Sequence, residues 1–139
     1  MKINFYDLEQ SIVDLSRQIT MCYINNYMNA SLEFINESKT IVAELISNAV
    51  IHSGATFVEL ILTHDKNRLY ITVKDNGVGI DDIEKAKEPL YSTKRNEERA
   101  GLGFTIIDVF SDSFNIESNN GTIVTVSKKI QRGDNNEYC

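Results

Sequence analysis

The sequence predicts an α/β fold, a two-layer sandwich of a mixed, mostly antiparallel sheet with helices on one face. Alternating apolar residues at 57–63 and 69–74, and again at 113–118 and 122–130, indicate two hairpins. Apolar residues at helical spacing before the first hairpin indicate two helices. The resulting order is strand, two helices, hairpin, loop, helix and hairpin, which suits one layer of strands and one of helices.

The composition limits the class of protein. With 139 residues the chain suits one domain, which we expect at 1–130, followed by a disordered tail at 131–139. Its net charge of -6 argues against direct nucleic-acid binding or attraction to anionic membranes. The polar start and the lack of a long apolar run predict no membrane segment and a cytoplasmic location. We therefore expect proteins or a metal-bound nucleotide as partners.

The first elements are a short strand and a helix. Residues 2–6 alternate weakly and suit an edge strand, and Asp7 with Gln10 forms a capping-box pattern, which predicts a helix starting after Asp7. Arg17 on this helix is a candidate partner contact. Apolar residues spaced by four and three predict a seam that faces the core, on a helix that also contributes to a dimer: Leu8, Ile12, Leu15, Ile19 and Cys22.

The second helix carries the first candidate site. Ser31 suits its N-cap and Gly54 its end. Glu44 and Asn48, one turn apart, share a polar arc with few charges, which resembles a cavity wall. The carboxylate can accept a proton, and the amide oxygen can bind a hard cation. Taken alone, this pattern is more often an ordinary amphipathic helix.

A glycine-flanked aspartate follows the first hairpin. Asp75 can accept a hydrogen bond from an exocyclic amine such as that of adenine, and Gly77 and Gly79 let the backbone approach a flat ligand. Asn-Gly is also a strong hairpin signal, but residues 81–87 look helical rather than extended. A plain turn remains the commoner source of such a pattern.

A basic loop precedes the third helix. Residues 88–100 suit a mobile loop that gathers Lys94, Arg95 and Arg99 in an otherwise acidic chain. Gly101 and Gly103 then open an apolar helix at 104–110, whose free N–H groups and dipole attract anions such as a triphosphate. By itself, a capped helix after a basic loop is the simpler interpretation.

Together these weak motifs supply the parts of a Mg-ATP site: an adenine acceptor, a metal ligand, a proton acceptor and a phosphate-binding loop. The sequence contains no GxxxxGK[ST] loop, no GxGxxG opening a βαβ unit, and no HRD or DFG motif. The common nucleotide-binding and protein-kinase folds are therefore excluded on motif grounds.

The ordered set resembles the GHKL ATPase family, which includes gyrase, Hsp90, histidine kinases and MutL. The resemblance implies the Bergerat, or histidine-kinase-like ATPase, fold and ATP or ADP with Mg²⁺ as cofactors. Its motifs fall on Glu44, Asn48, Ala49 and His52; on Asp75, Gly77, Gly79 and Ile80; on Gly101, Leu102, Gly103 and Phe104; and on Gly121 and Thr122.

Residue roles follow from this resemblance. It implies that Glu44 is the general base, that Asn48 helps to hold Mg²⁺, and that Asp75 binds adenine, whereas we expect His52 to be structural. The residues expected to contact the nucleotide are Asn48, Asp75, Gly77, Gly79, Ile80, Thr93, Lys94, Arg99, Ala100, Gly101, Leu102, Gly103, Phe104 and Thr122.

Within the family, residues 88–94 and 97–106 resemble the sporulation anti-sigma kinases. This resemblance implies a homodimer that inhibits a sporulation sigma factor and uses Mg-ATP to phosphorylate a serine of an anti-anti-sigma factor. Alternatives are a switch kinase of the general stress-response type, a non-catalytic ATP-sensing adaptor and a detached histidine-kinase catalytic domain. We expect the last least, because no phosphoacceptor helix pair precedes the domain, so the acceptor must arrive in trans.

Overall fold

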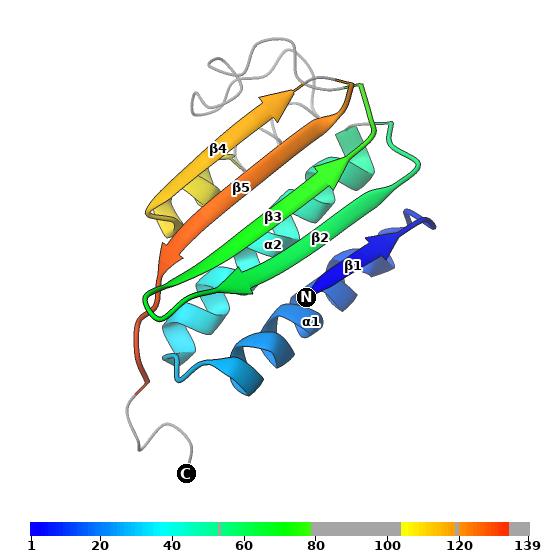
Figure 1. Ribbon diagram of the computed structural model, residues 1–139. Helices are drawn as coiled ribbons and strands as arrows, with labels where there is room; N and C mark the ends of the chain where they lie inside the picture. The colour runs from blue at the N-terminus through cyan, green and yellow to red at the C-terminus, as the bar shows by residue number, and fades with distance from the viewer. Residues whose placement is uncertain (53, 79–103, 119, 134–139) are drawn as a thin grey trace.

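The computed structural model describes residues 1–52, 54–78, 104–118 and 120–133. Its sheet has five strands in the order β1-β2-β3-β5-β4, and every described neighbouring pair is antiparallel (Figure 1). The predicted α/β fold is confirmed, with an antiparallel rather than a mixed sheet over these residues. The strands are β1 Lys2–Phe5, β2 Val58–His64, β3 Arg68–Asp75, β4 Ser113–Ser118 and β5 Thr122–Lys129.

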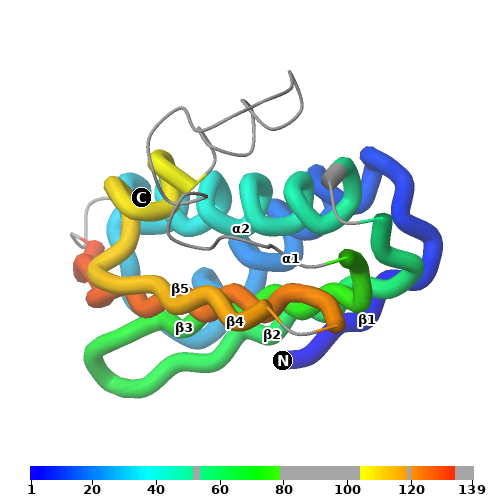
Figure 2. Tube along the Cα trace, turned by 90° about the horizontal axis from the view of Figure 1, so that it is seen from above, coloured from blue at the N-terminus to red at the C-terminus, as the bar shows by residue number. Residues whose placement is uncertain are grey.

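The helices form the second layer. They are α1 at Ser11–Tyr27, α2 at Leu32–His52 and a short helix at 104–110. Figure 2 shows all three on the same face of the sheet, as the sequence predicts. None of the helices in the described ranges is long and apolar enough to cross a membrane.

The central helix α2 has the boundaries that the sequence predicts. The Ser31 hydroxyl accepts a hydrogen bond from the Phe34 N–H at 3.1 Å, so this side chain caps the helix. Gly54, just beyond the other end, has a φ of 65°, which glycine adopts without strain. Phe34, Ile41 and Ile46 are fully buried, and each contributes about 1.5–3 kcal/mol of hydrophobic stabilisation.

The start of α1 differs from the prediction. The helix begins at Ser11, and its N-cap residue, Gln10, makes no side-chain capping bond. The Asp7 carbonyl instead accepts a hydrogen bond from the Glu9 N–H at 3.0 Å. The predicted capping box is therefore wrong, because the chain leaving β1 first makes a turn through Asp7 to Glu9.

The predicted seam of α1 is also partly wrong. Ile12 is buried, but Leu15 is 50% exposed and Cys22 is exposed as well. The face toward the core contains two small hydroxyl residues that a hydrophobic pattern does not reveal, and the Thr20 hydroxyl donates to the Ser16 carbonyl at 2.8 Å. The buried residues of the helix are Ile12, Val13, Ser16, Thr20, Tyr23 and Ile24.

A buried lysine joins the sheet to two helices. Lys128 of β5 is only 5% exposed, and its ammonium donates to the Glu37 carboxylate of α2 at 2.7 Å and to the Phe110 carbonyl. The ammonium also lies 5.5 Å from the centre of the Phe34 ring. A cation is favourable at the C-terminal end of the helix at 104–110. One side chain thus links β5, α2 and this short helix.

Lys128→Met should lower the free energy of unfolding by about 3 kcal/mol, because it leaves the largely buried Glu37 carboxylate without its cation. Urea denaturation followed by circular dichroism would measure this loss. Lys129→Met, at the exposed neighbouring position, is the control and should change stability by less than about 0.5 kcal/mol. Equal losses in the two variants would show that the ion pair does not stabilise the fold.

Candidate functional site

Asp75 lies where two central strands meet. It ends β3 and pairs in register with Thr122, the first residue of β5. The Gly77 N–H donates to the Asp75 carboxylate at 2.9 Å, which holds the side chain against its own turn. A Cβ atom on Gly121 would lie 2.2 Å from the Asp75 carbonyl oxygen, so only glycine allows this approach.

Burial makes the charge of Asp75 costly. Desolvation raises the pKa of its carboxyl above the ordinary aspartate value, although hydrogen bonds from the backbone N–H groups of Gly77 and Thr122 partly offset the effect. A further donor on a ligand would favour the ionised form in the same way. The carboxylate is therefore suited to accept a hydrogen bond from an amine.

Asn76 fixes this turn to the segment that follows α2. Its side-chain oxygen accepts hydrogen bonds from the N–H groups of Thr56 at 3.0 Å and Phe57 at 3.1 Å. Its amide nitrogen donates to the Thr56 hydroxyl at 2.9 Å. This role was not predicted from the sequence, because Asn followed by Gly was interpreted only as a turn signal. The only local clue was the capacity of an asparagine to cap free backbone groups.

Glu44 and Asn48 are both half-buried and lie one turn apart on α2, as expected. Other positions near them on α2 are less open: Ile41 is fully buried and Ser47 is only 4% exposed. The Asn48 amide nitrogen is buried and has no hydrogen-bond partner in the described part of the chain. No hydrogen bond from this nitrogen to the described chain fixes the amide, so its oxygen can face a cation. The residue present therefore fits the expected metal ligand.

These features gather at one end of the molecule. Figure 1 shows that α2 ends, β3 ends and β5 begins at the same end of the sandwich.

Phe104, at the start of the described part of the third helix, is buried and stacks on Phe114 with 6.3 Å between ring centres. Its side chain therefore serves the core.

The other expected nucleotide contacts lie outside the described residues and stay predictions: Gly79, Ile80, Thr93, Lys94, Arg99, Ala100, Gly101, Leu102 and Gly103. The same holds for the helix-like stretch at 81–87 and for the loop at 88–100. Arg17, the candidate partner contact, forms an exposed ion pair with Asp14 one turn away on α1. The structure does not bring Arg17 together with the site.

Comparison with known proteins supports the class of ATPase that the sequence motifs predict. Residues 36–132 match the family described as histidine kinase-, DNA gyrase B- and HSP90-like ATPase, and the chain belongs to this family. Membership of an ATPase family indicates that ATP or ADP is its ligand. The predicted GHKL resemblance is thereby confirmed.

Particular relatives are proteins named anti-sigma F factor. That of Bacillus licheniformis is 34% identical over 138 residues, which cover 95% of this chain and 93% of the relative. That of Clostridium perfringens (strain SM101 / Type A) is 38% identical over 111 residues, which cover 74% and 78%. These sequence identities confirm the resemblance to the anti-sigma kinases.

A solved structure shares the fold. The blue-light activated histidine kinase of Erythrobacter litoralis EL346 matches with a TM-score of 0.56 and 21% identity. The match covers 74% of this chain and 32% of that one, so this chain spans about a third of the kinase. At this identity the likeness concerns the fold alone.

Gly121→Ala should destabilise the protein by at least about 3 kcal/mol and weaken nucleotide binding, because the new methyl group would collide with the Asp75 backbone. Gly54→Ala is the matched control, since Gly54 also has a positive φ but no other atom lies within 4 Å of the place its new methyl group would take. It should cost only about 1 kcal/mol. Thermal melts and nucleotide titrations would compare them, and equal effects would contradict the close approach.

Asp75→Asn should abolish ATP binding but leave the fold at least as stable at neutral pH. The raised pKa means that the folded chain binds the Asp75 proton more tightly than the unfolded chain, so ionisation costs stability. The stability gained by the variant should shrink as the pH falls through the folded-state pKa of Asp75. Urea denaturation across this range would test the sign, and a gain that grows on acidification would contradict it.

Proposed function

We propose that this chain is an ATP-dependent protein serine kinase that also binds and inhibits a sporulation sigma factor. Its phosphoryl acceptor is a serine of an anti-anti-sigma factor. The observation that carries the proposal is the similarity to anti-sigma F factors over 95% of an ATPase-family chain. The half-buried pair Glu44 and Asn48 and the turn at Asp75 supply groups suited to this reaction.

Adenine recognition is assigned to the end of β3. The Asp75 carboxylate accepts a hydrogen bond from the exocyclic amine, beside Gly77 and Thr122, whose N–H groups hold the carboxylate in place. Because Asn76 ties the turn to Thr56, the acceptor is positioned before the ligand arrives. Such preorganisation lowers the entropic cost of binding.

Phosphoryl transfer is assigned to the half-buried strip on α2 that carries Glu44 and Asn48. The serine hydroxyl attacks the terminal phosphorus of ATP, the bond to the bridging oxygen breaks, and the hydroxyl proton passes to the Glu44 carboxylate. Asn48 would hold Mg²⁺, which would supply positive charge to balance that of the phosphates. Lys94 and Arg99 are assigned to the phosphate oxygens. In this scheme the protein mainly aligns the two reactants and removes one proton.

The regulatory contacts are assigned to the outer surface of α1. Leu15 is half-exposed and Cys22 is exposed on this helix, which supports its use as a contact between two copies in a homodimer. Arg17 lies on the same helix and is proposed as a contact for the sigma factor or the anti-anti-sigma factor. These residues are exposed, which supports the assignment, because a buried side chain is unable to contact another protein.

Glu44→Gln should reduce phosphoserine formation at least about a hundredfold while ATP still binds, since it removes the proton acceptor and keeps the shape. The assay combines the full chain, Mg-ATP and the cognate anti-anti-sigma factor, with mass spectrometry of the acceptor. Glu33→Gln, at an exposed position of the same helix, should transfer normally. Normal transfer by Glu44→Gln would exclude Glu44 as the base, and intact ATP with the unmodified chain would indicate a non-catalytic adaptor.

A further inference from the structure

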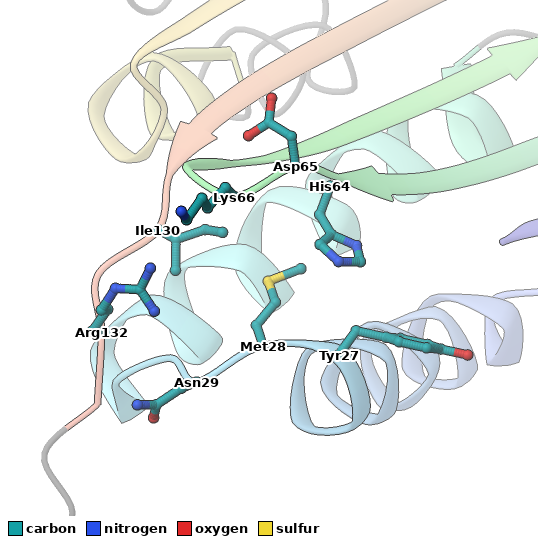
Figure 3. A pocket seen from close by; sticks show the side chains of 8 residues that line it. All are labelled: Tyr27, Met28, Asn29, His64, Asp65, Lys66, Ile130 and Arg132. Atoms are coloured by element: carbon teal, nitrogen blue, oxygen red, sulfur yellow. The ribbon is translucent and has the colours of Figure 1, made fainter.

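A hollow lies at the other end of the sandwich from Asp75, beside the turn between β2 and β3. Its volume is about 370 Å³. Three segments meet there: the end of α1 with the link to α2, the β2–β3 turn, and the chain after β5 (Figure 3). The lining residues are Tyr27, Met28, Asn29, His64, Asp65, Lys66, Ile130 and Arg132.

Backbone hydrogen bonds hold these segments together. The Ile130 N–H donates to the Asn67 carbonyl at 2.8 Å, which joins the end of β5 to the β2–β3 turn. The Ser31 N–H donates to the Gln131 carbonyl, also at 2.8 Å, which joins the same segment to the start of α2. On the α1 side, the Tyr23 hydroxyl lies 2.6 Å from the His64 ring nitrogen. The hollow is therefore a fixed feature of the fold.

The basic side chains of the hollow have no partner among the residues that the structure describes. Neither Lys66 nor Arg132 forms a hydrogen bond or ion pair through its side chain with any other part of the described chain. Four other described basic residues are paired with acids: Arg17, Arg68, Lys74 and Lys128. Figure 3 shows the charged ends of Lys66 and Arg132 flanking Ile130.

The one acidic lining residue does not neutralise them. The Asp65 carboxylate accepts hydrogen bonds from the N–H groups of Asn67 and Arg68, both at 2.8 Å, and from the Tyr70 hydroxyl at 3.0 Å. These bonds lower the pKa of its carboxyl and keep it engaged with its own turn. Figure 3 shows the carboxylate directed away from Met28 and Arg132. The hollow thus presents positive charge in a chain whose net charge is -6.

Part of the lining of the hollow is apolar or aromatic. Met28 and Ile130 are half-buried, and Tyr27 is 61% exposed beside them. Exposed aromatic residues and methionines that flank cations are typical of protein-binding surfaces. A ligand that fits carries a carboxylate for Lys66 and Arg132 together with an apolar side chain that packs on Met28 and Ile130. An acidic peptide that also contains aliphatic residues has both features.

We propose that this hollow binds an acidic, partly apolar peptide segment of a partner protein, at a surface separate from the nucleotide site. Carboxylates of the segment pair with Lys66 and Arg132, and its aliphatic side chains pack on Met28 and Ile130. Because the hollow is distant from Asp75, the peptide and a nucleotide bind at the same time. This docking surface does not depend on the kinase chemistry proposed above.

The probe is a fluorescein-labelled peptide that alternates glutamate with leucine, titrated into the ¹⁵N-labelled full chain and followed by fluorescence anisotropy and NMR. Chemical shifts should change at residues 27–29, 64–66 and 130–132. Lys66→Gln with Arg132→Gln should weaken binding about tenfold, because two exposed charge pairs are lost. The control is Lys2→Gln with Lys129→Gln, which removes the same charge from exposed positions elsewhere and should bind normally.

A peptide that alternates glutamine with leucine should bind about tenfold more weakly than the glutamate peptide, because it cannot form the charge pairs with Lys66 and Arg132. ATP affinity and melting temperature should be unchanged in the Lys66 and Arg132 variant, which separates this test from that of the kinase. The proposal is overturned by no binding, by equal weakening in the lysine control, or by shift changes elsewhere. It is also overturned if inorganic phosphate displaces the peptide at similar concentration, since the hollow would then be a small-anion site.

Discussion

The burial of α2 against both α1 and the sheet is the constraint on which the rest of the structure depends. Phe34, Ile41 and Ile46 have no exposed surface, so the helix has little freedom to rotate or slide. The half-buried strip that remains carries Glu44 and Asn48. A rigid helix therefore presents the two groups assigned to chemistry, as an alignment-dependent reaction requires.

The junction of β3 and β5 supplies the other fixed point. Gly121 lies so close to the Asp75 backbone that no larger residue fits, and Asn76 ties the same turn to the segment after α2. These contacts hold the Asp75 carboxylate at a place where burial disfavours its charge. Such a cost is retained where a ligand interaction compensates for it, and for this reason Asp75 suits a binding role better than a purely structural one.

Patterns governed by local spacing were predictable from the sequence, and long-range contacts were not. The strands, the Ser31 cap and the spacing of Glu44 and Asn48 follow from periodicity and capping chemistry, so each was found. The α1 seam was partly misassigned, because hydrophobicity does not show that a small hydroxyl residue such as Thr20 is buried. The buried Lys128 was missed for a related reason: its partner Glu37 is distant in sequence.

The central claim is that the turn at Asp75 and the strip on α2 bind the two ends of one nucleotide. A crystal structure of the full chain with magnesium and a non-hydrolysable ATP analogue tests it most directly. We expect the adenine amine within hydrogen-bonding distance of the Asp75 carboxylate and the metal beside Asn48. A nucleotide bound elsewhere, for example in the hollow beside Tyr27, or one that contacts neither residue, would contradict it.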